Sequence, residues 1–128
     1  MEEKNLSSGL EDYLECIFNN IQEKGCVKAI EISKELDVSR ASVTDALHRL
    51  AKKSYINYER YGAIEITTKG IAKAKEVIDK HNILKSFFEK VLLLPNDEAS
   101  ENACRIEHVI TKNAFNKLKD YTLSHTDK

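Results

Sequence analysis

The spacing of hydrophobic residues predicts a helix over about residues 8–24. Asp12 and Glu15 fall on the polar face of this segment, opposite its apolar residues. Ser8 is the predicted N-cap, with Glu11 completing a capping box, and Gly25 is the predicted end of the helix. The apolar face holds Leu10, Tyr13, Leu14, Ile17, Phe18 and Ile21. The chain is therefore predicted to begin with an amphipathic helix that buries one side.

Two shorter helices and a hairpin are predicted next. Residues 28–37 place Ile30, Ile32 and Leu36 inward, and Ser39 is the predicted cap of a helix over about 40–53. The segments 56–60 and 63–67 then alternate apolar and polar residues about a turn. The buried side of the second helix is Val43, Leu47 and Leu50. Two short helices with a tight connection, followed by a hairpin, predict a winged helix-turn-helix.

The second half is predicted to be entirely helical. A long helix runs from Thr68 to about Leu92, and helices over about 97–110 and 112–124 follow it. The apolar surface of the long helix exceeds what packing onto a small winged domain uses, which favours a homodimer. The predicted fold class is mainly α (α+β). A winged helix-turn-helix domain is predicted over residues 1–72, followed by an all-helical dimerisation domain over 73–128. The metal-ligand residue types described below lie mostly in this second domain, which is therefore predicted to be a metal-binding and dimerisation domain.

The composition of the chain excludes several classes of function. The 128 residues are 41% hydrophobic and carry a formal net charge of −1, so any nucleic-acid surface must be a local patch. No apolar run is long enough to span a bilayer, and we expect a cytoplasmic protein with no membrane partner. Three cysteines without a C-x-x-C pair argue against a disulfide framework or a zinc knuckle.

The predicted second helix of the helix-turn-helix, together with the hairpin, carries that patch. Between residues 39 and 62, five basic side chains stand against two acidic ones. Phosphates attract such a patch, whereas base edges are read by residues near the start of the helix. The candidate residues at that start are Ser39, Arg40, Ser42, Thr44 and Asp45, and the candidate phosphate contacts are Arg49, Lys52, Lys53 and Arg60.

Metal-ligand residue types gather at three places. Cys104, Glu107 and His108 have the spacing that places them on one face of a helix, with Ala99, Ala103, Ile106, Val109 and Ile110 on the buried side. His81 lies in the apolar stripe of the long helix. Carboxylates gathered without a cation would repel one another, and a divalent metal removes that penalty. The candidate ligands are Asp12, Glu15, His81, Cys104, Glu107 and His108.

These motifs resemble the metalloregulator family of the diphtheria toxin repressor and the manganese transport regulator. The similarity rests on residues 11–15 (EDYLE), Val43-Thr44, residues 66–70 (ITTKG), Lys80-His81 and residues 103–109 (ACRIEHV). It extends from Leu10 to about Tyr121. The resemblance implies a homodimeric, metal-activated repressor that binds a palindromic operator in double-stranded DNA, with the six candidate residues as metal ligands.

The candidate ligands combine features of two branches of the family, so the sequence does not determine which metal binds. Asp12 and Glu15 resemble the manganese-responsive branch, whereas Cys104 resembles the iron-responsive branch. Oxygen ligands suit Mn²⁺ and a thiolate shifts preference toward Fe²⁺, while Co²⁺, Ni²⁺ and Zn²⁺ can occupy such sites in vitro. The predicted cofactor is therefore Mn²⁺ or Fe²⁺.

Three alternatives remain at this point. A metal-independent winged-helix regulator would respond to an organic effector and would retain DNA binding without Glu107 and His108. A small metal-dependent hydrolase is disfavoured because the chain shows neither a substrate loop nor a nucleophile–base pair, so we expect no enzyme and no organic substrate. A winged helix used only for protein contacts is disfavoured by the basic patch.

Overall fold

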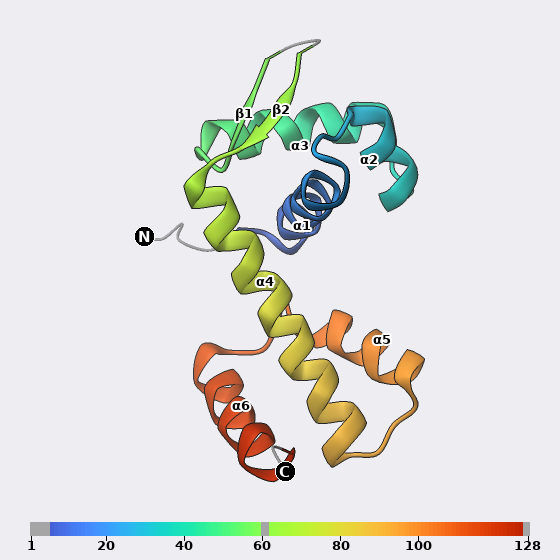
Figure 1. The fold of residues 1–128 in the computed structure, drawn as a ribbon, viewed down its shortest axis with the longest axis vertical. Coiled ribbons are helices and arrows are strands. Elements are labelled where there is room, and N and C mark those ends of the chain that lie inside the picture. The colour runs from blue at the N-terminus through green and yellow to red at the C-terminus, as the bar shows by residue number, and fades with distance from the viewer. Residues whose placement is uncertain (1–5, 60–61, 127–128) are drawn as a thin grey trace. The chain divides into compact units, whose positions relative to one another are not determined.

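The computed structural model describes residues 6–59 and 62–126, which form two compact units, Met1–Glu76 and Val77–Lys128 (Figure 1). The described chain is mostly helical with one two-stranded sheet, which confirms the predicted fold class. No helix in these residues is both long and apolar enough to cross a membrane.

The first unit begins with α1 (Ser8–Lys24). The predicted N-cap at Ser8 is wrong by one residue, because the Ser7 hydroxyl accepts a hydrogen bond from the Leu10 N–H at 3.3 Å. Ser7 is extended and its carbonyl accepts the first helical bond, from the Glu11 N–H. Gly25 ends α1 with a φ of 85°, as predicted for a glycine C-cap.

The helix-turn-helix consists of α2 (Ala29–Leu36) and α3 (Arg40–Lys52). Ser39 caps α3 by accepting from the Ser42 N–H at 3.0 Å, which confirms that prediction. The inward placement of Ile30 is wrong, since this side chain is 42% exposed; an eight-residue helix buries a narrow face, which Ile32 occupies. The fully buried side chains of this unit include Leu14, Ile17, Ile32, Val43, Leu47, Leu50 and Ile56.

The wing is the antiparallel pair β1 (Ile56–Tyr58) and β2 (Ile64–Ile66), with Ile56 opposite Ile66. The Tyr58 ring meets the His48 ring of α3 edge-on, at 5.6 Å between centroids. The wing therefore packs directly on α3.

A compact junction joins the wing to α4 (Thr68–Ser86). The single Thr67 hydroxyl proton is shared between the carbonyls of Ser54 (2.7 Å) and Tyr55 (2.9 Å), and the hydroxyl oxygen accepts from the Gly70 N–H. A Cβ on Gly70 would lie 2.0 Å from the Tyr55 carbonyl oxygen. Only glycine lets the first turn of α4 lie this close to Tyr55, the residue before β1.

The second unit contains the end of α4, the π-helical turn η1 (Phe87–Val91), α5 (Asn96–Ile106) and α6 (Lys112–Thr126). Both α5 and α6 pack against η1. The side chains of Leu84, Ala99 and Ala103 are fully buried here. The small alanines let α5 approach its neighbours closely.

The prediction that α5 extends to about residue 110 is wrong. The N–H groups of Val109 and Ile110 both bond to the Ile106 carbonyl at 3.0 Å, which closes a turn directly after the helix. Val109, expected on the buried face, is consequently 75% exposed. Glu107 and His108 therefore lie in the turn that follows α5 and not on the helix itself.

Candidate metal centre

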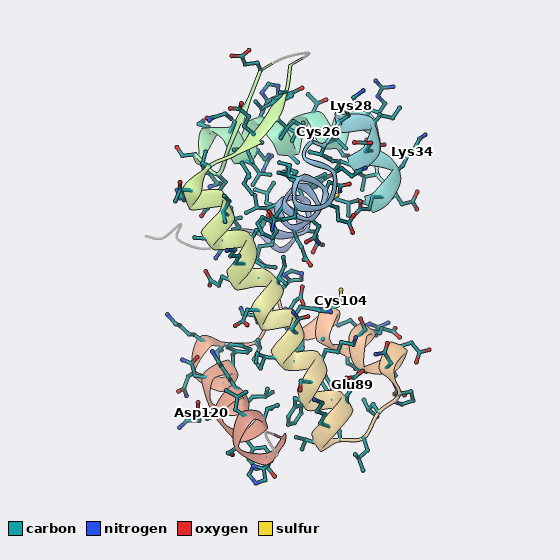
Figure 2. The ribbon with its side chains drawn as sticks, viewed as in Figure 1. Cys26, Lys28, Lys34, Glu89, Cys104 and Asp120 are labelled. Atoms are coloured by element: carbon teal, nitrogen blue, oxygen red, sulfur yellow. The ribbon has the colours of Figure 1, made fainter. Side chains whose placement is uncertain are left out.

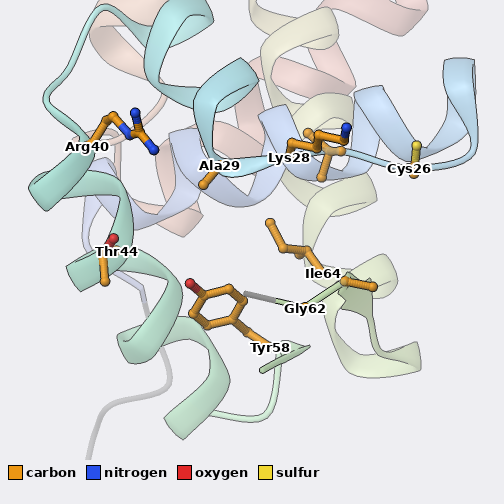
Figure 3. Close-up of a pocket in the computed structure, with 10 residues that line it drawn as sticks. Cys26, Lys28, Ala29, Arg40, Thr44, Tyr58, Gly62 and Ile64 are labelled. Carbon is orange, nitrogen blue, oxygen red and sulfur yellow. The ribbon is translucent and has the colours of Figure 1, made fainter. Parts of the chain in front are cut away.

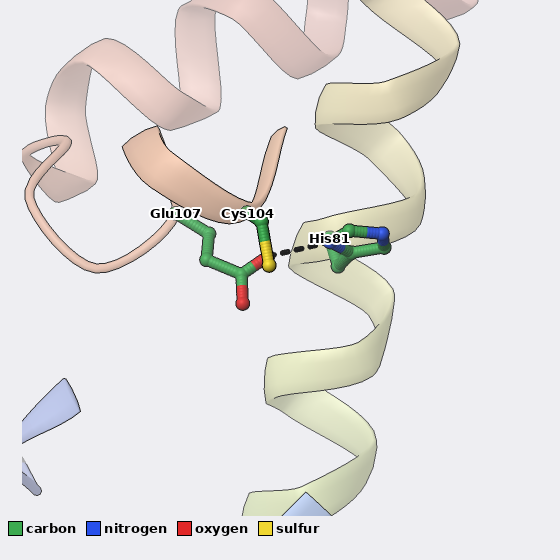
Figure 4. A group of neighbouring side chains, drawn as sticks. All are labelled: His81, Cys104 and Glu107. Carbon is green, nitrogen blue, oxygen red and sulfur yellow. Dashed lines mark hydrogen bonds and ion pairs between the residues drawn. The ribbon is translucent and has the colours of Figure 1, made fainter. Parts of the chain in front are cut away.

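A buried carboxylate stands at the centre of the candidate site. Glu107 is 3% exposed, and its Oε1 lies 2.7 Å from the His81 Nδ1 atom (Figure 4). Its Oε2 lies 3.3 Å from the Nε2 atom of His108, whose side chain is 13% exposed. One carboxylate thus contacts two imidazoles inside the second unit.

Cys104 completes a group of three different ligand types. A sulfur, a ring nitrogen and a carboxylate oxygen from Cys104, His81 and Glu107 all lie within 4.8 Å of one another. In Figure 4 the Cys104 sulfur and the Glu107 carboxylate are directed toward His81. Cys104 is exposed, so solvent reaches this side of the group.

The end of α5 explains how these residues meet. The sequence places all three ligand residues of this segment on one helical face, but in the structure their side chains differ in burial. Cys104 is exposed on the last turn of α5, whereas Glu107 is the C-cap and points inward. Because the chain turns after Ile106, Glu107 enters the interior and His108 lies beside it.

The residues fit a divalent transition metal. A buried carboxylate needs a counter-charge, and either a protonated imidazole or a metal ion supplies one. An ion pair with a histidine does not need a nearby thiol, but an imidazole, a carboxylate and a thiolate together are typical ligands of transition metals. The mixed donor set therefore fits a metal better than a simple ion pair.

Asp12 and Glu15 belong to the first unit. Both lie on α1, where Asp12 is exposed and Glu15 is half-buried. Their assignment as ligands stays a prediction from the EDYLE motif.

Cys16 lies next to Glu15 but has a different environment. The thiol is 3% exposed, and burial together with the Glu35 carboxylate raises its pKa to about 12. Asn20 Nδ2 contacts the Cys16 sulfur at 3.6 Å and donates to Glu35 Oε1 at 3.0 Å. Cys16 is thus a protonated residue in the contact between α1 and α2.

The predicted DNA-contacting residues lie on the exposed side of α3 or directly beside it. Ser39, Arg40, Ser42, Thr44, Asp45, Arg49, Lys52 and Lys53 are all exposed, while Arg60 lies outside the described residues. Asp45 pairs with Arg49 one turn later at 2.9 Å. Burial, and then the charge of Asp45, raise the pKa of Tyr13 on α1. Each DNA contact remains a prediction.

A cavity of about 540 Å³ opens between α3 and the wing (Figure 3). Arg40 and Thr44 line one side and Tyr58 the other. Lys28 and Cys26, which Figure 2 also labels, complete the polar lining. Lys28 and Tyr58 are not among the binding residues predicted from the sequence, although Lys28 is a basic residue directly before α2 and Tyr58 is an aromatic residue of the wing.

Two family models match the chain, a DNA-binding domain in its first half and a metal-binding domain in its second half. Residues 5–64 match the iron dependent repressor N-terminal DNA binding domain. Residues 67–126 match the iron dependent repressor metal binding and dimerisation domain. The chain belongs to the iron-dependent repressor family. This result confirms the resemblance inferred from sequence, and the family consists of metal-dependent transcriptional regulators and not of enzymes.

Curated relatives of this family member support the same assignment. An uncharacterised HTH-type transcriptional regulator of Methanocaldococcus jannaschii is 37% identical over 124 residues, covering 96% of this chain and 99% of that protein. The HTH-type transcriptional regulator MntR of Oceanobacillus iheyensis is 31% identical, covering 87% of this chain and 75% of that protein.

Solved structures share the fold. The IdeR of T. acidophilum is 25% identical with a TM-score of 0.78, covering 98% of this chain and 56% of that one. A manganese-dependent transcriptional repressor in complex with manganese is 22% identical with a TM-score of 0.78, covering 88% of this chain and 52% of that one. The chain therefore spans slightly more than half the length of these two proteins.

Proposed function

We propose that this iron-dependent repressor family member binds a palindromic operator as a homodimer when Mn²⁺ or Fe²⁺ is present. One observation carries the proposal: a buried carboxylate contacts two imidazoles, with a thiol among the same ligand atoms. The names of its relatives support manganese or iron as the effector.

His81, Cys104, Glu107 and His108 would hold the ion. When bound, the ion supplies positive charge that neutralises the Glu107 carboxylate and favours the Cys104 thiolate. Asp12 and Glu15 complete the proposed ligand set, and this part of the proposal rests on their motif alone. If Asp12 and Glu15 bind the ion, metal binding would act directly on α1 of the DNA-binding unit.

Cys104 is the residue that sets the metal preference in this proposal. A thiolate favours Fe²⁺, Co²⁺ or Zn²⁺ over Mn²⁺, whereas a carboxylate at this position would favour Mn²⁺. We expect Cys104→Glu to shift the relative affinity toward Mn²⁺. Competition between Mn²⁺ and Co²⁺ on wild type and variant measures that shift, and an unchanged ratio would exclude a selectivity role for Cys104.

Exposed apolar side chains support a homodimer. In the second unit Leu92 (50%), Leu93 (80%), Tyr121 (47%) and Leu123 (48%) are large apolar residues exposed to solvent. These residues lie on α6 or directly after η1, two elements that pack against each other, and a continuous apolar surface across them would be typical of a protein interface. Sedimentation of the metal-loaded protein over a concentration series tests this part, and a monomer at all concentrations would contradict it.

The test of the function is selection from a random-sequence DNA library. We expect anaerobic protein with Fe²⁺, or aerobic protein with Mn²⁺, to enrich duplexes with two-fold sequence symmetry. The same selection with a chelator should enrich none. Enrichment that is unaffected by the chelator, or by Glu107→Ala and His108→Ala, would favour the alternative of a metal-independent regulator with an organic effector.

A further inference from the structure

Two consecutive residues of α4 contact Glu107, one at its side chain and the other at its main chain. His81 contacts the carboxylate at 2.7 Å, while the Lys80 ammonium donates to the main-chain carbonyl of the same residue at 3.3 Å. Lys80 is half-buried, and its hydrogen bond to Glu107 spans 27 positions in the sequence.

The Lys80 ammonium donates to a carbonyl at the C-terminal end of α5. The carbonyls at the end of a helix lack intrahelical partners, and Glu107 is the C-cap of α5. The N–H groups of Val109 and Ile110 bond to the Ile106 carbonyl. A cationic donor at a helix C-terminus is also favoured by the helix dipole. Lys80 therefore fixes the main chain at the residue where α5 ends.

Lys80 has a second neighbour, but that contact is weaker. The ammonium lies 5.7 Å from the centroid of the Phe115 ring on α6. This distance is close to the limit of about 6 Å for a useful cation–π interaction. The hydrogen bond to Glu107 is also long, at 3.3 Å, but it joins Lys80 to the main chain of a candidate ligand, whereas the ring contact joins it to α6. The Glu107 carbonyl is therefore the contact that bears on the metal centre.

We infer that Lys80 is a positioning residue of the metal centre. It holds the turn from which the Glu107 carboxylate and the adjacent His108 ring are directed to the site. An ammonium has no lone pair, so Lys80 itself binds no metal. The inference rests on the proposed metal binding. Loss of residues that orient metal ligands commonly costs about 10- to 100-fold in affinity.

The test compares Lys80→Met, Lys80→Arg and the control Lys75→Met. Methionine keeps an apolar stem but removes the donor, arginine restores a cationic donor, and Lys75 is an exposed residue of the same helix. Each metal-free protein is titrated with Co²⁺, whose visible and near-ultraviolet absorption reports ligand arrangement and thiolate binding. Urea unfolding of the metal-free proteins is measured in parallel.

We expect Lys80→Met to weaken Co²⁺ binding by about tenfold or more and to change the Co²⁺ spectrum. Lys80→Arg should restore both, and Lys75→Met should match wild type. Equal affinity and spectra for Lys80→Met and Lys75→Met would overturn the inference, while the proposed function would stand. Unfolding of metal-free Lys80→Met would show a structural role and would also overturn it. Absence of Co²⁺ binding by wild type would refute the proposed function, and the inference would fail with it.

Discussion

The carboxylate of Glu107 is 3% exposed and lies between two imidazoles. A charge buried to this extent is stable only with a counter-charge and hydrogen bonds, and at this site a metal would supply the charge. At the scale of single residues, the ligand chemistry of the second unit therefore depends most on Glu107.

Glu107→Gln should abolish high-affinity metal binding and leave the fold intact. The amide keeps the shape of the side chain but loses the negative charge that attracts the ion. We expect Co²⁺ affinity to fall by about 100-fold or more, beyond the effect of a residue that only orients a ligand. Glu101→Gln, on α5 and paired with Arg105 at the surface, is the control. Equal Co²⁺ affinities in the two variants would remove Glu107 from the site.

The three cysteines should differ in their response to alkylation. Cys26 and Cys104 are exposed and should react with iodoacetamide at neutral pH, whereas Cys16 is buried with a pKa of about 12. Because metal would bind the Cys104 thiolate, Mn²⁺ or Co²⁺ should protect Cys104 but not Cys26. Mass spectrometry of the labelled peptides measures each site. Identical Cys104 labelling with and without metal would contradict a ligand role.

Gly70→Ala should destabilise the winged unit. The added Cβ would lie 2.0 Å from the Tyr55 carbonyl oxygen and 2.8 Å from an Ile66 side-chain carbon, so the backbone must move. We expect a loss of about 2–3 kcal/mol in the free energy of unfolding, measured with urea. Gly9→Ala in α1 meets nothing within 4 Å and should stabilise by about 0.5–1 kcal/mol. Equal effects at the two positions would contradict this account of the junction.

At the scale of elements, sequence periodicity predicted the helix-turn-helix, the wing and the three later helices. α3 also begins at the Ser39 cap and α1 ends at Gly25 as expected, because capping depends on local hydrogen bonds and φ angles. The end of α5 was not predictable in this way. Its apolar spacing continues to Ile110, but the backbone turns at Glu107, where contacts from α4 stabilise the turn.

The Glu31 carboxylate at the start of α2 should make the free energy of unfolding depend on pH in the acid range. The Lys28 N–H donates to Glu31 Oε1 at 2.8 Å, and this bond, followed by Lys24, lowers the pKa of Glu31. A lowered folded-state pKa gives stabilisation that is present above about pH 4.5 and lost as the pH falls through the folded value.

Glu31→Gln should therefore lower the urea midpoint at neutral pH, and its difference from wild type should shrink in acid. The control is Glu23→Gln, an exposed position of α1. A difference between wild type and Glu31→Gln that stays constant from neutral pH to about pH 3 would contradict this cap.

At the scale of the whole molecule, the family assignment joins a DNA-binding half to a metal-binding half. The sequence identified His81, Cys104, Glu107 and His108, and the structure brings these four together within the second unit. Spacing on one helix could not show that Glu107 is the buried member, since this depends on packing against α4. For Asp12 and Glu15, the motif remains the basis of the prediction.

Metal at this site is proposed to control the affinity of the protein for DNA. The most direct measurement is fluorescence anisotropy of one duplex, enriched by the Mn²⁺ selection, with wild type and Glu107→Gln, each with Mn²⁺ and with chelator. A coupling of 1–3 kcal/mol is typical between linked sites, so wild type should bind about 5- to 150-fold more tightly with Mn²⁺. Glu107→Gln should bind weakly in both conditions. Wild-type affinity that is the same with Mn²⁺ and with chelator would contradict the account.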